Sequence, residues 1–301
     1  MHIPDGFLSP GVWVTLDVVS LPAVGWMARR ARRDTEDRRI PLMGVMGAFV
    51  FAAQMINFPV GLGTSGHLVG AALLSMALGP AAASVVMTAI LAIQAFVFQD
   101  GGIVVLGANI FNMALAGVLA GYLPYRMMGS RWRSGAIFVG GVLSVLVSAC
   151  LALAELALSG VRVPGQMLSV SLGLFAVSAV IEGAITLGAV RAIERLNPSA
   201  VRGANTASSP AWGVLAAAAV LLTAAGILFA SRAPDGIQHL AQQLGLAEHS
   251  PRWLAAPLAG YQMQTAPNGW MRKAAAGLAG LVIIYGLCLA TGRFLTRQRD
   301  A

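Results

Sequence analysis

Hydrophobic runs long enough to cross a bilayer recur along the whole chain, and they constrain its fold more than any other feature. A transmembrane helix needs about 20 mostly apolar residues. The 301 residues are 57% hydrophobic and only 11% charged, whereas a soluble domain carries about 25% charged residues. Because backbone groups inside a bilayer must find hydrogen bonds within the protein, such runs fold as helices. The sequence therefore predicts an all-α, polytopic membrane helical bundle.

The basic residues are gathered in four short segments. The chain has a formal net charge of +8, and 15 of its 20 basic residues are arginines at positions 29–39, 126–133, 191–202 and 293–299. These segments lie between or after hydrophobic runs, as cytoplasmic loops do in membrane proteins, and do not indicate a nucleic-acid-binding face. We expect no nucleic-acid partner. We expect a multi-pass protein in the lipid of a bacterial cytoplasmic (inner) membrane, with the N-terminus outside and the C-terminus in the cytoplasm.

Nine helical spans fit this topology, and they divide the chain into two domains. Residues 1–196 are expected to hold about seven core helices, residues 197–210 a polar linker, and residues 211–301 a two-helix appendage with an extracytoplasmic loop. The expected spans are residues 12–28, 41–56, 67–78, 81–98, 103–123, 135–158, 166–190, 211–230 and 274–295. Cys150 and Cys288 fall within apolar runs, where we expect small packing residues and not a disulfide or metal pair.

The N-terminal stretch MHIPDG carries an unusual set of nitrogen donors. The α-amine of Met1, the backbone amide of His2 and the Nδ1 atom of its imidazole can close a five-membered and a six-membered chelate ring. These three nitrogens lie naturally in one plane. A fourth nitrogen from another histidine would complete a square-planar set, which suits Ni(II) or Cu(II).

The fourth nitrogen must come from His67, His239 or His249. His67 is the one histidine within a hydrophobic span, and ionisable residues in membrane segments usually serve function. Glycines at positions 61, 63, 66 and 70 would let another backbone segment approach it. A buried core histidine or an interfacial anchor is the alternative, but we expect a metal ligand. The other two histidines lie in the predicted outer loop, either as ordinary loop residues or as groups that deliver metal.

Several polar residues interrupt the apolar sequence near the predicted outer face. They can hold the ligand imidazoles through free ring N–H groups, or they can serve as helix caps and helix-to-helix hydrogen bonds. Glu155 and Glu182 also lie in spans but have no pairing partner in the sequence, and we assign them no role. The candidates for holding the imidazoles are Asp5, Asn57, Ser65, Gln94, Asp100 and Asn109.

Three separated blocks resemble the CbiM/NikM family, the substrate-capture components of energy-coupling-factor (ECF) transporters for cobalt and nickel. The blocks are MHIPDGFLSP, VFAAQMINFPVGLGTSGHLVGAAL and FQDGGIVVLGANIFNM, and the resemblance covers residues 1–196. In that family the terminal amine, the amide and imidazole of the second residue, and a histidine in the TSGH block hold the metal. The resemblance implies that Met1, His2 and His67 do so here. It also implies a transmembrane coupling subunit of the CbiQ/NikQ type and cytoplasmic ATPase subunits of the CbiO/NikO type.

The C-terminal part is similar to the small NikN-like auxiliary subunit with a PDGLE motif, which accompanies nickel transporters of this kind. It contains SRAPDGIQHLAQQLGL between two spans. The motif here is PDGIQ, so any role of the final acid is in doubt.

The residues together predict a substrate-binding subunit for uptake of a divalent metal ion, with Ni(II) favoured and Co(II) for corrin synthesis as the alternative. The ion is the transported substrate; we expect no cofactor and no enzyme activity. The chain lacks the G-x-x-x-x-G-K-[ST] phosphate-binding pattern, so ATP must be hydrolysed by another polypeptide. Two rivals stay open: an intramembrane serine protease, because 63–66 reads G-T-S-G with a histidine nearby, and a purely structural assembly subunit.

Overall fold

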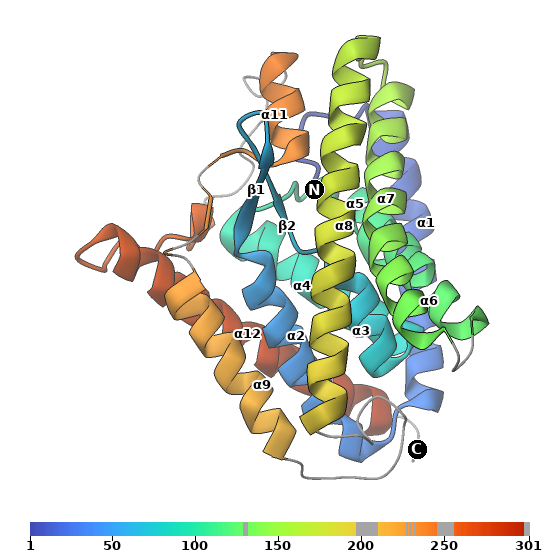
Figure 1. Ribbon diagram of the computed structural model, residues 1–301, viewed down its shortest axis with the longest axis vertical. Coiled ribbons are helices and arrows are strands. Elements are labelled where there is room, and N and C mark those ends of the chain that lie inside the picture. Colours follow the sequence, from blue (N-terminus) through green and yellow to red (C-terminus); the bar gives the residue numbers. More distant parts are fainter. Residues whose placement is uncertain are drawn as a thin grey trace.

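The computed structural model describes residues 1–128, 132–196, 210–226, 228, 230–231, 233–245 and 256–297. Within these residues the protein is a bundle of helices with one small two-stranded sheet (Figure 1). Six helices are long and apolar enough to cross a membrane. The predicted all-α membrane bundle is therefore confirmed, and the chain is a multi-pass membrane protein.

Each of the nine expected spans coincides with a helical segment. Two are short, α2 (Ile40–Gln54) and α3 (Ala71–Leu78), and α4 (Pro80–Ile93) ends in a π-helical turn, Gln94–Phe98. One rod comprises α5 (Leu106–Asn109), a π-helical segment (Ile110–Gly117) and α6 (Val118–Met127). The remaining long helices are α1 (Pro10–Asp34), α7 (Arg133–Leu158), α8 (Gly165–Leu196) and α12 (Gly269–Arg297). Shorter segments are Asp37–Arg39, α9 (Pro210–Leu221) with its π-helical turn Leu222–Gly226, α11 (Gly236–Gln243) and Ala259–Tyr261.

The third expected span, residues 67–78, is wrong at its start. His67 ends a strand, and the helix begins only at Ala71. Strands β1 (Asn57–Gly61) and β2 (Thr64–His67) form an antiparallel hairpin that pairs Asn57 with His67. The backbone explains the difference. Gly61, Leu62 and Gly63 all have positive φ, which makes a tight reversal, and Gly70 (φ 73°) takes a left-handed conformation that separates strand from helix.

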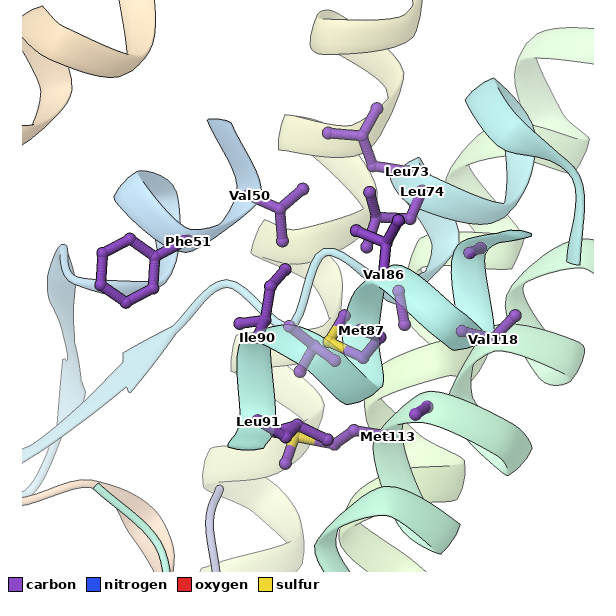
Figure 2. Close-up of a cluster of buried hydrophobic side chains, with 14 of the residues drawn as sticks. Val50, Phe51, Leu73, Leu74, Val86, Met87, Ile90, Leu91, Met113 and Val118 are labelled. Carbon is purple, nitrogen blue, oxygen red and sulfur yellow. The ribbon is translucent and has the colours of Figure 1, made fainter. Parts of the chain in front are cut away.

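The core lies where α2, α3, α4 and the α5–α6 rod meet (Figure 2). Every residue of α3 is buried, so this short helix is surrounded by protein along its whole length. Glycines bring other helices close together: a Cβ on Gly141 of α7 would lie 2.7 Å from the Cα of Gly183 in α8. The labelled core side chains are Val50, Phe51, Leu73, Leu74, Val86, Met87, Ile90, Leu91, Met113 and Val118.

The appendage, residues 211–301, packs α9 and α12 against α2 of the core. Cys288 of α12 is buried, and a Cβ on Gly47 of α2 would lie 2.9 Å from its sulfur. Cys150 is exposed on the apolar surface of α7, and both cysteines are free. Nearly all of the expected linker, residues 197–209, lies outside the described residues.

The two ends of the bundle differ in character. Figure 1 shows the N-terminus, the hairpin and α11 in one half of the molecule. The C-terminal ends of α1, α6, α8 and α12, which carry or adjoin the four arginine-rich segments, lie in the other half. The unusual polar residues and the arginines are thus separated along the long axis.

Candidate metal centre

The first residues of the chain are threaded into the bundle and buried. Met1, His2 and Ile3 are 7%, 4% and 0% exposed. Asn109 of α5 accepts a hydrogen bond from the Ile3 amide (2.8 Å) and donates one to the Ile3 carbonyl (3.0 Å). The Gly102 amide donates to that carbonyl as well (2.9 Å). This clamp fixes the backbone directly after His2.

The Asp5 carboxylate fastens the same segment to the loop that follows α4. It accepts hydrogen bonds from the backbone amides of Ile103, Val104 and Val105. Gly101, in the same loop, has a φ of 92° and lies so close that a Cβ there would be 3.2 Å from the Cβ of His2. Asp5 and Asn109, two of the predicted polar candidates, therefore position the N-terminal backbone and do not contact an imidazole.

The structure places the α-amine of Met1 beside the ring of His67. The amine nitrogen and His67 Nε2 are 2.6 Å apart. His67 Nδ1 lies 3.0 Å from the Leu68 carbonyl, which accepts a hydrogen bond and thereby assigns the ring proton to Nδ1. Burial, the charge of the amine and the charge of His2 lower the pKa of His67 to about 4. At neutral pH Nε2 therefore presents a free lone pair to the amine.

The ring of His2 stacks on the ring of His67, with centroids 5.3 Å apart and an interplanar angle of 6°. Both ring nitrogens of His2 are buried without a hydrogen-bond partner. His2 Nδ1 lies 3.3 Å from Asp100 Oδ1, at ion-pair distance but not in hydrogen-bond geometry. Buried polar nitrogens without partners are uncommon in proteins, and these two leave the His2 ring free to bind a ligand.

This geometry fits two neighbouring positions of a planar metal complex. Two adjacent nitrogens, each about 2 Å from one metal ion, lie about 2.8 Å apart in a square plane. The Met1 amine and His67 Nε2 are 2.6 Å apart. Among the described residues no cluster of three or more His, Cys, Asp or Glu side chains could hold a metal. Terminal and backbone nitrogens are further donors that this arrangement offers to a metal.

Asp235 was not among the residues expected from the sequence, yet it lies in this site. Its Oδ2 atom accepts a hydrogen bond from the Met1 ammonium group (2.7 Å) and lies 3.8 Å from His67 Nε2. Burial would raise the pKa of Asp235, but the charges of the amine and of His67 hold it below its usual range. The PDGIQ motif is visible in the sequence, but nothing in it indicates a role for its aspartate at a metal site.

The PDGIQ motif caps α11. Asp235 is the N-cap residue, its Oδ1 accepts from the Gln238 amide (2.8 Å), and the Gln238 side chain accepts from the Asp235 amide. Glutamine and glutamate both complete such a capping box. The replacement of the final acid of PDGLE by Gln238 therefore keeps the local structure.

Asp100 connects His2 to a second residue of the appendage that the sequence did not indicate. Tyr261 donates a 2.5 Å hydrogen bond to Asp100 Oδ2. Burial would raise the pKa of Asp100, but the charge of His2 and the hydrogen bond from Tyr261 hold it well below its usual range. Gln94, another predicted candidate, bonds to the Tyr261 oxygen (3.4 Å) and to Gln54 (2.9 Å).

The remaining candidates support the site from the hairpin. Asn57 pairs with His67 across the two strands, and its carbonyl accepts from the Ser231 amide (2.7 Å). Ser65 is buried, and its hydroxyl donates to the Ala233 carbonyl (2.7 Å). Because this hydroxyl bonds to a carbonyl and the His67 ring faces the Met1 amine, the geometry does not favour a serine protease.

The structure also shows the contacts of Glu182, Glu155 and His239. Glu182 of α8 accepts hydrogen bonds from the amides of Val69 and Gly70 (both 2.8 Å) and so fixes the chain directly after His67. Glu155 accepts from Asn112. His239 contacts Gln243 on α11, and His249 lies outside the described residues.

A cavity of about 580 Å³ leads to the site between the core and the appendage. His67, Asn57 and Asp100 line it from the core, and Asp235, Tyr261 and Lys273 line it from the appendage. The cavity is much larger than one metal ion, so it can hold a hydrated ion on its way to the nitrogens.

Residues 2–200 match the family model described as CbiM, cobalt uptake substrate-specific transmembrane region. The chain belongs to the CbiM family. A fused nickel transport protein, NikMN of Rhodobacter capsulatus, is 28% identical and aligns over 99% of both chains. A relative from Archaeoglobus fulgidus that again carries the name NikMN is 34% identical over 98% of this chain and 99% of its own.

Solved structures place this CbiM-family protein among metal transporters too. A truncated transition metal transporter superposes with a TM-score of 0.58 at 32% identity, covering 65% of this chain and 99% of that chain. These relatives are transporters and not enzymes. The protein is therefore a component for the uptake of a metal ion, and its match to fused relatives extends through the appendage.

Proposed function

We propose that this protein captures Ni(II) at the outer face of the membrane as a complex of four nitrogens. The donors are the Met1 amine, the amide and Nδ1 of His2, and Nε2 of His67. The observation that carries the proposal is the 2.6 Å approach of the buried Met1 amine to His67 Nε2, with the unpartnered His2 ring stacked alongside.

The donor set favours Ni(II) over most divalent ions. Planar nitrogen coordination and an ionised amide suit ions late in the affinity series. The carboxylates of Asp100 and Asp235 face the site and attract a divalent cation. Co(II) is the alternative, because the family description names cobalt uptake and the relatives' names include both metals.

Transport from this site requires other subunits. The chain carries no ATP-binding motif of its own. We therefore infer an ECF assembly with a CbiQ/NikQ-type transmembrane subunit and CbiO/NikO-type ATPases. Movement of this protein against the coupling subunit would then carry the bound ion toward the cytoplasm.

The proposal is tested by adding one alanine before Met1. The extension moves the α-amine one residue away from the chelate, so we expect high-affinity Ni(II) binding to be lost. Isothermal titration calorimetry on the detergent-purified protein measures the affinity, and mass spectrometry verifies the N-terminal residue of each sample. Titration with Co(II) in parallel is expected to give weaker binding than Ni(II).

The control for this experiment keeps the free amine and changes a distant site. Gly135→Ala adds a methyl group where no atom lies within 4 Å, and it should bind metal normally. High-affinity Ni(II) binding by the extended protein would contradict the donor set.

A further inference from the structure

We propose that the appendage completes the metal site of the core through two positioning residues, Asp235 and Tyr261. Asp235 orients the Met1 amine, and Tyr261 holds the Asp100 carboxylate beside Nδ1 of His2. The inference rests on the proposed function. It adds that the appendage supplies groups that position two of the proposed metal ligands.

Asp235 is held rigidly at the strand that ends in His67. The Ser65 amide donates to the Pro234 carbonyl (2.8 Å), and Ser65 and Asp235 form a parallel bridge. The capping box of α11 fixes the carboxylate itself. As a result, Oδ2 meets the Met1 amine at 2.7 Å where both side chains are 7% exposed.

Tyr261 is held just as firmly against the core. Its ring stacks on Phe98, with centroids 4.6 Å apart, and contacts Phe51. The Leu258 amide, three residues earlier, donates to the Val97 carbonyl (3.0 Å). Burial and the neighbouring carboxylate of Asp100 raise the pKa of Tyr261, so its hydroxyl stays protonated and donates to Asp100.

These contacts orient the donors before the metal arrives. An amine nitrogen that binds a metal still carries N–H bonds, so it can keep donating to Asp235. Asp100, held by Tyr261, lies 3.3 Å from His2 Nδ1, so its negative charge stands beside the donor that takes the metal. Removing partners that orient metal ligands lowers metal affinity by roughly 10- to 100-fold.

Asp235→Asn and Tyr261→Phe test the inference in the full chain. Asparagine is as good an N-cap as aspartate, and phenylalanine keeps the ring that stacks on Phe98. We therefore expect both metal-free variants to keep the helix content of the unmodified protein by circular dichroism, although Asp235→Asn removes the ion pair of the buried Met1 amine. The Kd for Ni(II), measured by calorimetry, should rise roughly 10- to 100-fold in each variant.

The visible absorption of the nickel-loaded protein separates a positioning residue from a ligand. At saturating Ni(II) both variants should show the spectrum of the unmodified protein, because the four nitrogens are unchanged. A changed spectrum in Asp235→Asn would show that Asp235 is itself a ligand and would overturn the inference. A Kd within twofold of the unmodified value in either variant would overturn it as well.

Two matched substitutions control for the loss of a charge and of a hydroxyl elsewhere. Asp34→Asn changes an exposed aspartate at the end of α1, and Tyr122→Phe changes a tyrosine of α6. Both should bind Ni(II) with unchanged Kd. If the unmodified protein bound no Ni(II), the proposed function would fail; loss of affinity in the variants alone supports the appendage's role.

Discussion

At the scale of residues, the N-terminal stretch MHIPDG is explained by contacts with distant parts of the chain. The Met1 amine meets His67 and Asp235, which are 66 and 234 residues away. Asn109 hydrogen-bonds to the Ile3 backbone, and the Asp5 carboxylate accepts hydrogen bonds from three backbone amides. Each of these interactions keeps His2 buried against His67.

The neutral state of His67 predicts how the metal-free protein responds to acid. Its pKa is lowered from 6.5 to about 4 in the folded protein. Between these pH values the ring is protonated in the unfolded chain and neutral in the folded chain. This contribution to the free energy of unfolding is present above pH 6.5 and is lost as the pH falls toward 4. Thermal midpoints in detergent between pH 7.5 and 4.5 should therefore decrease.

His67→Asn provides the comparison, because it removes the titrating ring and keeps a polar side chain. The decrease in midpoint over the same pH range should be smaller in this variant. Equal slopes for the two proteins would mean that His67 is not held in its neutral form.

At the scale of elements, two irregular segments create the site. The β1–β2 hairpin brings His67 to the N-terminus, and the loop after α4 provides Asp100 and the glycines that receive the N-terminal backbone. Glu182 reaches from α8 to the amides of Val69 and Gly70 and so ties the hairpin to the bundle. Irregular backbone is tolerated in a membrane protein where the surrounding protein satisfies its hydrogen bonds.

Gly102→Ala tests whether the loop must receive the N-terminal segment. A Cβ at this position would lie 2.5 Å from the Asp5 backbone nitrogen and would collide with the Asp5 carboxylate. The N-terminal residues must then shift, so we expect the Kd for Ni(II) to rise at least roughly 10-fold, as for other losses of ligand orientation. Circular dichroism should show the same helix content as the unmodified protein. Unchanged affinity would show that the N-terminal backbone tolerates displacement.

At the scale of the whole molecule, the arginines lie apart from the candidate metal site, and this separation predicts how the protein is oriented in the membrane. The arginine-rich helix ends share one half of the bundle, and the N-terminus and hairpin share the other (Figure 1). Arginine-rich ends stay in the cytoplasm, which would place the site at the outer face. An uptake protein needs its capture site there.

Cysteine labelling checks this orientation. In a chain with Cys150 and Cys288 replaced by serine, Leu62→Cys places a thiol on the hairpin turn and Trp132→Cys places one before α7, both at well-exposed positions. A membrane-impermeant maleimide should label the Leu62 position in intact cells and the Trp132 position only after permeabilisation. The reverse pattern would invert the topology.

Much of the fold could be predicted because each membrane helix is encoded by a local hydrophobic run. The span 135–158 matches α7 to within two residues, since its hydrophobic run is long and continuous. The start of α3 was wrong because the local signals for the hairpin are glycines on either side of Leu62, and glycines allow a reversal without requiring one. Met1, His2 and His67 could be proposed from their donor chemistry. Asp235 lies in the PDGIQ motif, which indicated no role for it, and Tyr261 lies in a turn with no distinctive pattern.

The sequence by itself determined a membrane bundle, its arginine-rich ends and an N-terminus with several nitrogen donors, because these depend on composition and on the order of neighbouring atoms. Only the tertiary structure decided that the N-terminus folds inward, that His67 turns Nε2 toward it, and that the appendage supplies Asp235 and Tyr261. Those contacts join residues up to 234 positions apart. They exist because helix packing brings the segments together, and no local stretch of sequence encodes such packing alone.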